Sequence, residues 1–219
     1  MAIIFDLDGT LIDSIPLHEK TFKYGIDKVL GKNAVPMSFL KKMVRYPTPM
    51  ILGRAAKKFH LKIDKKTYSK ILVAKREALS SKKISKIKTF DDAVNLMKFL
   101  KRNKIKFCIA TGLNTEELKR FTRILKLKRF LCPIINPDCQ AHEKPNPYIL
   151  NKSIRILRVN KRDAVYIGDS PYDFLAAKRA GIKFIGVFNK KELEKHGNFY
   201  NTFSDVAKKI RNNLTLFGD

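Results

Sequence analysis

The chain has 219 residues, 44% of them hydrophobic, which is enough for one well-cored domain or for a core domain that carries a smaller inserted one. This composition excludes the disordered and fibrous classes of protein. The apolar runs are far shorter than the roughly 20 residues of a membrane span, and Asp6 interrupts the first run before a secretory signal could form. We therefore expect a cytoplasmic protein with no membrane partner.

The net charge is the unusual feature of the composition. Lys and Arg number 46 against 20 Asp and Glu, which gives a formal charge of +26 and a pI near 10.1. Such an excess indicates either an anionic partner, such as nucleic acid or a phosphorylated metabolite, or a lysine-biased composition of the kind found in thermophiles. The lysines are scattered along the chain, so both interpretations stay open at this point.

The cysteines argue against a cross-linked or zinc-bound protein. Cys108, Cys132 and Cys139 are an odd number and have no Cys-x-x-Cys spacing. This pattern predicts buried, reduced thiols.

The first predicted element is a buried strand over residues 2–7, and the next strand comes only at residues 107–111. The gap of roughly a hundred residues is much longer than one crossover helix requires, so it holds an inserted unit. Amphipathic stretches predict helices over four segments of the insert, namely 17–30, 39–44, 50–59 and 65–79. We expect residues 1–14 and 88–219 to form the core and residues 15–87 to form a small helical domain.

Strands and helices alternate along the rest of the chain. Apolar runs predict further strands over 133–136, 164–168 and 183–188, with helices over 115–126, 145–157 and 171–180 between the last four strands. The helix over 171–180 should end at Gly181, and a final helix is predicted over 205–213. This alternation predicts an α/β fold with a doubly wound parallel sheet.

Acidic residues follow two of the predicted strands. Asp6 and Asp8 come at the end of the first strand, and Asp169 and Asp173 follow the strand over 164–168. Because ligands bind outside the carboxyl ends of strands in an open α/β sheet, we expect the four carboxylates to converge there. Unpaired, they would raise one another's pKa, and Mg²⁺ is the natural partner for such a set of oxygen ligands.

Groups that suit a phosphate follow the other strands. Thr111 and Gly112 end the second strand with a hydroxyl and backbone N–H groups, and Lys144 comes after the third strand. These are the donors and the positive charge that a phosphoryl group requires. The sequence therefore predicts a phosphate site beside the metal site.

Taken together, these residues resemble the haloacid dehalogenase superfamily, and within it the phosphatases similar to phosphoglycolate phosphatase, which carry a helical cap after the first strand. Taken alone, Asp6 and Asp8 could cap a turn, and Asp169 could cap the helix that begins near Pro171. If all of these residues were only caps, four unrelated caps would have to occur in the same order along the chain as the motifs of the family. The resemblance covers nearly the whole chain and consists of four motifs in order, Asp6-x-Asp8-Gly9-Thr10, Cys108-Ile109-Ala110-Thr111, Lys144-Pro145 and Gly168-Asp169-x-x-x-Asp173.

The resemblance implies a role for each acid. Asp6 would be the nucleophile that attacks phosphorus, and Asp8 would be the general acid and base. Mg²⁺ would be bound by the Asp6 carboxylate, the main-chain carbonyl of Asp8 and the Asp169 carboxylate. Asp173 would be a further ligand or an anchor for the ligands.

The other motif residues would handle the phosphoryl group. Thr111, Gly112 and Lys144 would bind its oxygens, and Lys144 would also offset the accumulated negative charge. Asp8 favours phosphoryl transfer because dehalogenases of the superfamily lack an acid at that position. The resemblance implies a Mg²⁺-dependent phosphatase, monomeric or homodimeric, that hydrolyses a small phosphomonoester through an aspartyl-phosphate while its cap excludes bulk water.

The cap selects the substrate in relatives, and three of its residues are candidate substrate contacts. His18 lies near the hinge to the cap, and Arg45 and Arg54 lie in the region that faces the site in relatives. The alternatives are an ordinary helix histidine and two surface arginines.

Two other functions remain open. The first is a phosphomutase of the β-phosphoglucomutase type, which shares all four motifs and which His18, Lys41, Lys42 and Arg45 do not exclude. The second is a nucleic-acid-associated phosphatase that processes strand ends, because the segment Ser14–Lys88 has 20 Lys and Arg against 4 Asp and Glu, a net charge of +16. This segment lacks the interleaved aromatic residues typical of single-strand binding, so nucleic acid is the less favoured partner.

Overall fold

A computed structural model describes residues 1–79, 81–125, 132–137 and 139–212. The chain divides into two compact units, one made of Met1–Asp13 with Lys88–Asp219 and the other of Ser14–Ile87. Within the described residues, no helix combines the length and apolar character that a membrane crossing requires.

The larger unit is built on a parallel sheet, which confirms the predicted α/β class. In the described part of the chain the six strands lie in the order β3-β2-β1-β4-β5-β6, and all neighbours are parallel. Their bounds are β1 Ala2–Phe5, β2 Lys106–Ala110, β3 Ile134–Ile135, β4 Ala164–Gly168, β5 Lys183–Val187 and β6 Phe199–Tyr200. The edge strand β6 was not predicted, because Phe199 and Tyr200 lie between asparagines and not in an apolar run.

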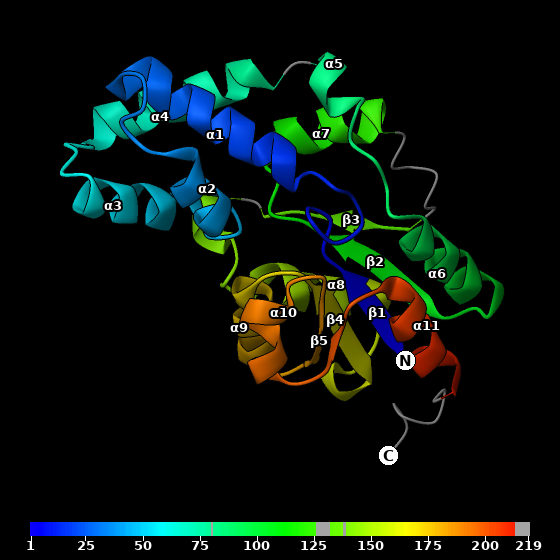
Figure 1. The fold of residues 1–219 in the computed structure, drawn as a ribbon. Helices are drawn as coiled ribbons and strands as arrows, with labels where there is room; N and C mark the ends of the chain where they lie inside the picture. The colour runs from blue at the N-terminus through cyan, green and yellow to red at the C-terminus, as the bar shows by residue number, and fades with distance from the viewer. Residues whose placement is uncertain (80, 126–131, 138, 213–219) are drawn as a thin grey trace. The chain divides into compact units, whose positions relative to one another are not determined.

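Helices cover both faces of this sheet (Figure 1). On one face, Ile4 and Tyr166 pack in a core cluster with residues of α8 (Tyr148–Leu157) and α9 (Pro171–Ala180). On the other face, the Phe5 ring lies 6.4 Å from Phe107 and 6.2 Å from Phe203, the first residue of α11 (Phe203–Asn212). The remaining helices of the unit are α6 Asp91–Arg102, α7 Thr115–Ile124, α10 Lys190–Leu193 and α11 Phe203–Asn212. The final helix thus begins near its predicted start, while residue 213 lies outside the described residues.

The start of α9 is fixed by a capping box. Ser170 Oγ accepts from the Asp173 backbone N–H, and the Asp173 carboxylate accepts in turn from the Ser170 N–H. Ser170 is therefore the N-cap, which removes the alternative explanation that Asp169 serves as the helix cap. The helix ends at Gly181 with φ of 71°, as predicted.

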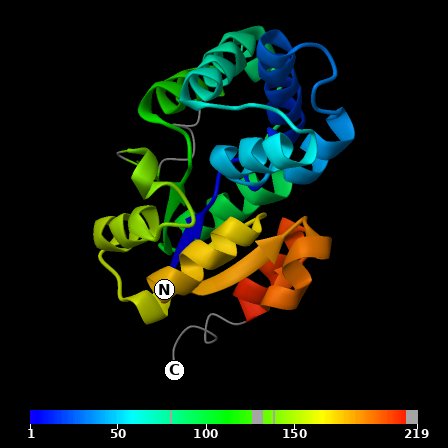
Figure 2. The same ribbon diagram turned by 90° about the vertical axis from the view of Figure 1, so that its left-hand side faces the viewer.

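In the described residues of the smaller unit, the regular elements are all helices. Its helices are α1 Ile15–Leu30, α2 Met37–Met43, α3 Thr48–Lys58, α4 Lys65–Ala78 and α5 Ser81–Ile84. The first four match the helices predicted in this segment to within about two residues. Helices α1 and α4 lie side by side in Figure 1 and in Figure 2. Gly25 of α1 makes this approach possible, since a β-carbon there would stand 2.7 Å from the Ile71 carbonyl oxygen.

The two segments that connect the units are paired with each other. Ile12 and Thr89 form an antiparallel bridge. The Asp13 N–H donates to the Lys88 carbonyl at 2.9 Å, and the Phe90 N–H donates to the Leu11 carbonyl at 3.1 Å. The chain therefore leaves the α/β unit and returns to it at one place.

The cysteines only partly match their prediction. All three are free, and Cys108 is buried, as expected, whereas Cys132 is half-buried and Cys139 is exposed. The prediction of a buried thiol is wrong for Cys139, because this residue lies in the irregular segment after β3 and not in a core strand. Burial raises the pKa of Cys108 and of Cys132 to about 12.

Candidate active site

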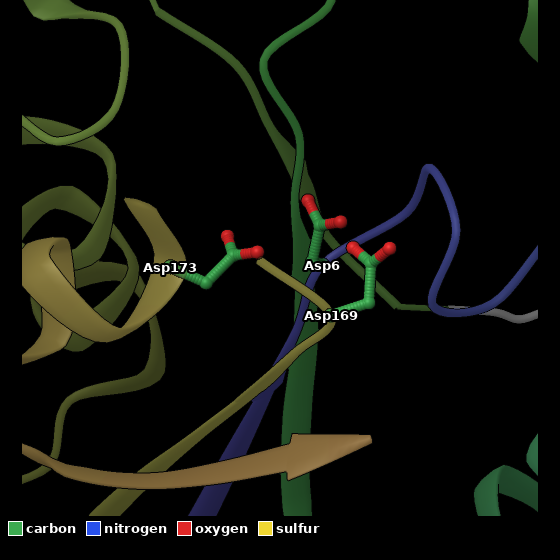
Figure 3. Close-up of side chains that lie close together, drawn as sticks. All are labelled: Asp6, Asp169 and Asp173. Atoms are coloured by element: carbon green, nitrogen blue, oxygen red, sulfur yellow. The ribbon is translucent and has the colours of Figure 1, made fainter. Parts of the chain in front are cut away.

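Three buried carboxylates meet at the carboxyl end of the central strands. Asp6 follows β1, Asp169 follows the neighbouring strand β4, and Asp173 lies in the first turn of α9. An oxygen from each lies within 4.8 Å of the other two, and Figure 3 shows the three side chains gathered above the strand ends. The Asp6 N–H donates to the Ile167 carbonyl at 2.9 Å, which ties the end of β1 to β4. The parallel register therefore brings residues 163 positions apart in the sequence into one site.

Gly168 makes room for the third carboxylate. It lies on the same face of β4 as Tyr166, the face that α9 covers. A β-carbon at position 168 would stand 2.6 Å from both Cβ and Cγ of Asp173, a distance that real side chains do not tolerate. The glycine thus allows the first turn of α9 to place Asp173 beside Asp6.

Lys144 is the cation of this cluster. Its Nζ donates to Asp6 Oδ1 at 2.6 Å, to Asp173 Oδ1 at 2.7 Å and to the Tyr166 hydroxyl at 3.1 Å. Burial alone would lower the pKa of Lys144, but the carboxylates of Asp173 and Asp6 outweigh it and raise the pKa above its usual value. The ammonium therefore stays charged at any physiological pH.

One lysine does not balance the negative charge at the site. Burial raises the pKa of Asp6 well above its usual value; Lys144 lowers it, while Asp173 and Asp169 raise it further. A divalent cation among these oxygens would supply the missing positive charge and favour the ionised form of Asp6. The buried carboxylate oxygens are the donors that Mg²⁺ prefers, so the residues present fit this metal.

Asp8 lies next to the carboxylate cluster, close enough for its charge to raise the pKa of Asp6. The turn after β1, where Gly9 has φ of 78° and Asp8 bridges to Ile12, redirects the chain. The Asp8 carboxylate accepts a long hydrogen bond, 3.5 Å, from the Thr111 hydroxyl. Among the described residues, Asp6, Asp169 and Asp173 offer oxygens within 4.8 Å of one another, and Asp8 lies beside them, at the end of β2.

The residues at the end of β2 form the second part of the site. The Thr111 hydroxyl accepts from the Leu113 N–H at 3.2 Å, which orients the hydroxyl. Next to it, Gly112 is exposed, and a β-carbon there would meet no atom within 4 Å. This edge of the site therefore offers space beside a fixed hydroxyl.

The three candidate substrate contacts belong to the helical unit. His18 is half-buried on α1, and Arg45 is half-buried between α2 and α3. Arg54 is exposed on α3, with its guanidinium 5.1 Å from the centre of the Tyr46 ring and its Nη1 3.8 Å from the Met43 sulfur. Their role in binding a substrate stays a prediction.

Two residues that contact the cluster were not predicted. Tyr166 reaches Lys144 and Asp173 with its hydroxyl, and Asn189 donates from Nδ2 to the Asp169 carbonyl at 3.2 Å. A tyrosine inside an otherwise aliphatic buried strand was an available signal for the first. Asn189 is a polar residue that follows β5, so the strand-end rule that found Asp6 would also have found it.

The sequence agrees with the geometry of the site. The sequence profile described as haloacid dehalogenase-like hydrolase matches residues 3–187. A protein of Caldanaerobacter subterraneus subsp. tengcongensis, provisionally named pyrophosphatase PpaX, is 29% identical over 190 residues, which cover 85% of this chain and 80% of that protein. Phosphoglycolate phosphatase 1 of Pseudomonas aeruginosa is 26% identical over 187 residues, which cover 83% of this chain and 66% of that protein.

Solved structures agree on the fold. A hydrolase from Pseudomonas syringae superimposes with a TM-score of 0.82 at 22% identity, covering 97% of this chain and 99% of that one. The profile match spans most of the chain and includes the strand ends that carry Asp6, Thr111 and Asp169. The chain belongs to the haloacid dehalogenase-like hydrolase family.

Proposed function

We propose that this protein is a Mg²⁺-dependent phosphatase that hydrolyses a small phosphomonoester through an aspartyl-phosphate on Asp6. The observation that carries the proposal is the contact of 2.6 Å between Lys144 Nζ and Asp6 Oδ1 inside a cluster of three buried carboxylates. A cationic donor beside a carboxylate nucleophile suits the transfer of an anionic phosphoryl group. The phosphatase and pyrophosphatase names of two relatives support the same class of reaction.

In the first half of the reaction, an Asp6 carboxylate oxygen attacks phosphorus. The bond between phosphorus and the leaving oxygen breaks, and the carboxyl group of Asp8 gives its proton to that oxygen. The products of this half are an alcohol and the aspartyl-phosphate. Asp8 suits this task because its carboxylate lies close to Asp6 and is hydrogen-bonded to Thr111, which would bind a phosphoryl oxygen.

In the second half, water replaces the alcohol. The Asp8 carboxylate takes a proton from the water, whose oxygen attacks phosphorus, and the bond between phosphorus and Asp6 breaks. Inorganic phosphate leaves, and both aspartates return to their starting states. The same residue thus serves as acid and then as base.

The charge of the phosphoryl group must be balanced throughout. Lys144 would donate to one of its oxygens while remaining at Asp6, and the Thr111 hydroxyl and the Gly112 N–H would bind another. Mg²⁺ held by Asp6 and Asp169, with Asp173 close by, would neutralise negative charge during the transfer. Protein groups on three adjacent strand ends would thus surround the reacting phosphorus.

We assign the choice of substrate to the helical unit of residues 15–87. Its candidates are His18, Arg45 and Arg54, and an arginine suits a second anionic group on the substrate because it can donate two parallel hydrogen bonds. Arg45→Ala and Arg54→Ala should each raise KM for the preferred substrate and leave kcat within about twofold. A fall in kcat as large as the rise in KM would contradict a role in substrate selection.

The test of the proposed function is phosphate release from a panel of sugar phosphates, phosphoglycolate, pyrophosphate, nucleotides and p-nitrophenyl phosphate. Each is assayed with Mg²⁺ and with EDTA, for wild type, Asp6→Asn and the control Asp92→Asn, which removes an exposed carboxylate at the start of α6. We expect Mg²⁺-dependent release that Asp6→Asn lowers on the order of a thousandfold or more. Asp92→Asn should have no effect on turnover.

Two outcomes would contradict this function. A folded, Mg²⁺-loaded wild type that releases no phosphate from any substrate would exclude a simple phosphatase. Interconversion of sugar phosphate isomers without net phosphate release would identify a phosphomutase.

A further inference from the structure

The hydroxyl of Tyr166 lies in the ion-pair network of the candidate active site, although its ring belongs to the core. Tyr166 is at the centre of β4, is fully buried and packs in the cluster formed with α8 and α9. Its hydroxyl accepts from Lys144 Nζ at 3.1 Å and donates to Asp173 Oδ1 at 2.7 Å. A phenylalanine would fill the same core space, so packing does not explain the hydroxyl.

The contacts of Lys144 show what this hydroxyl adds. The ammonium has three N–H donors, and the described structure gives it three acceptors, which are Asp6 Oδ1, Asp173 Oδ1 and the Tyr166 oxygen. Two acceptors would leave a flexible four-carbon side chain free to pivot about the line between them. The third acceptor fixes Nζ in all directions.

Tyr166 is also a rigid anchor. Its proton is directed at Asp173, so an oxygen lone pair is left for Lys144. The ring itself is held by core packing, with the Phe184 ring centre 6.2 Å away. An acceptor on a strand interior holds its partner more closely than an acceptor on a loop would.

We propose that Tyr166 is a positioning residue for phosphoryl transfer, and that its hydroxyl holds the Lys144 ammonium against Asp6. This inference rests on the proposed function, because Lys144 acts on a phosphoryl group only there. The tyrosine oxygen is the only neutral acceptor of the three named contacts and the most distant one.

The kinetic test compares Tyr166→Phe with wild type and with Tyr200→Phe, which removes a hydroxyl from the edge strand β6. The measured quantities are kcat, KM, the half-saturating Mg²⁺ concentration and the urea midpoint of unfolding. We expect Tyr166→Phe to lower kcat about tenfold at saturating Mg²⁺, because Lys144 is misplaced by a fraction of an ångström. The half-saturating Mg²⁺ concentration should stay close to that of wild type, and the urea midpoint should fall only modestly, because two buried hydrogen bonds are lost. Tyr200→Phe should leave all four quantities unchanged.

Three outcomes of this test would overturn the proposal. A kcat within twofold of wild type would show that Lys144 needs no third acceptor. A loss of activity that excess Mg²⁺ restores would mean that Tyr166 acts on Asp173 and the metal. A variant that fails to fold would assign Tyr166 a structural role only.

A second measurement does not depend on catalysis. A short pulse of deuterated acetic anhydride, followed by peptide mass spectrometry, gives the acetylation rate of each lysine in the folded protein. In Tyr166→Phe the rate at Lys144 should rise severalfold, while the rate at Lys23, which pairs with Asp27, should stay the same. An unchanged rate at Lys144 would contradict the inference. If the wild type releases no phosphate, the proposed function fails, and the labelling still decides whether Tyr166 holds Lys144.

Discussion

Gly168 and Asp173 are in such close contact that a β-carbon on the glycine would stand 2.6 Å from the carboxyl carbon of the aspartate. We expect Gly168→Ala to push Asp173 away from Lys144 and Asp6, because the start of α9 is fixed by its capping box. Overpacking of this kind lowers the free energy of unfolding by about 1–3 kcal/mol. Urea unfolding measures this change, and phosphate release should fall in parallel.

Asp173→Ala provides the matched background for this clash. Asp173→Ala removes the carboxyl group but keeps Cβ, which would also stand 2.6 Å from the new β-carbon, so it should relieve only part of the clash. The destabilisation caused by Gly168→Ala should therefore be smaller in the Asp173→Ala background than in wild type. Additive losses would show that the carboxyl group takes no part in the clash.

Mg²⁺ should stabilise the folded protein through the carboxylate cluster. The unfolded chain does not hold Asp6, Asp169 and Asp173 within 4.8 Å of one another, so the ion binds the folded state preferentially. At a hundred times its dissociation constant the gain is about 2.7 kcal/mol. Thermal unfolding with Mg²⁺ and with EDTA measures it, and Asp169→Asn should remove most of the difference. An equal Mg²⁺ effect in Asp169→Asn would place the ion elsewhere.

Gly25 and Gly53 predict opposite effects within the helical unit. A β-carbon on Gly25 would stand 2.7 Å from the Ile71 carbonyl of α4, whereas one on Gly53 would meet nothing within 4 Å. Gly25→Ala should therefore separate α1 from α4 and destabilise the unit by about 1–3 kcal/mol. Gly53→Ala, inside the exposed part of α3, should stabilise it by about 0.5–1 kcal/mol. Chemical denaturation of both variants checks the signs, and losses of equal size would contradict the packing described here.

The three thiols should differ in reactivity. Burial raises the pKa of Cys108 and Cys132 to about 12, so they carry almost no thiolate at pH 8, while Cys139 is exposed. Ellman's reagent should therefore modify one thiol quickly in the native protein and all three in urea. Cys139→Ser should abolish the fast phase, and a fast phase that survives this substitution would assign it to a different thiol.

The thiols of Cys108 and Cys132 should affect the stability of the protein at high pH. Because their pKa is higher in the folded state, the folded protein keeps protons that the unfolded chain releases above its ordinary thiol pKa near 9. Their contribution to stability is fully present below pH 9 and is lost as pH rises toward 12. A Cys108→Ala variant should lose less stability over this range than wild type.

Added salt should stabilise this protein. The net charge is +26, and in the helical unit Asp27 and Glu77 are already paired with Lys23 and Lys28, while Asp64 caps α4. Screening reduces the repulsion among the remaining lysines, so the melting temperature should rise by a few degrees between about 10 and 200 mM NaCl. Scanning calorimetry measures the rise. A constant melting temperature would show that the lysines are too far apart to repel one another.

Much of the site could be predicted from the sequence because strand ends are visible in it. An apolar run that stops at Asp6 or at Asp169 marks both the strand and the residue that leaves it, and parallel pairing then brings the two together. Lys144 was found by the same rule after the third strand. The predicted parallel sheet is confirmed, and the family resemblance is confirmed by the profile match.

The rest depended on geometry that a linear pattern does not carry. The partner of Asp8 could not be predicted, because it depends on the turn at Gly9 that brings the Asp8 carboxylate to the Thr111 hydroxyl. The position of Asp173 depends on the missing β-carbon of Gly168, and the role of Tyr166 depends on where its hydroxyl ends. These contacts depend on which side chains of neighbouring helices and strands can reach one another, and only the folded structure shows this.

The pairing of Ile12 with Thr89 makes the helical unit an insertion that begins and ends at one place in the α/β unit. The segments that lead into and out of residues 14–87 are hydrogen-bonded to each other, so these residues are connected to the α/β unit in the same way as the loop of a hairpin is connected to its two strands. The entropic cost of closing such an insertion changes only slowly with its length. The length and sequence of this segment can therefore change without disturbing the strand register that aligns Asp6 with Asp169, so the carboxylate cluster does not depend on it.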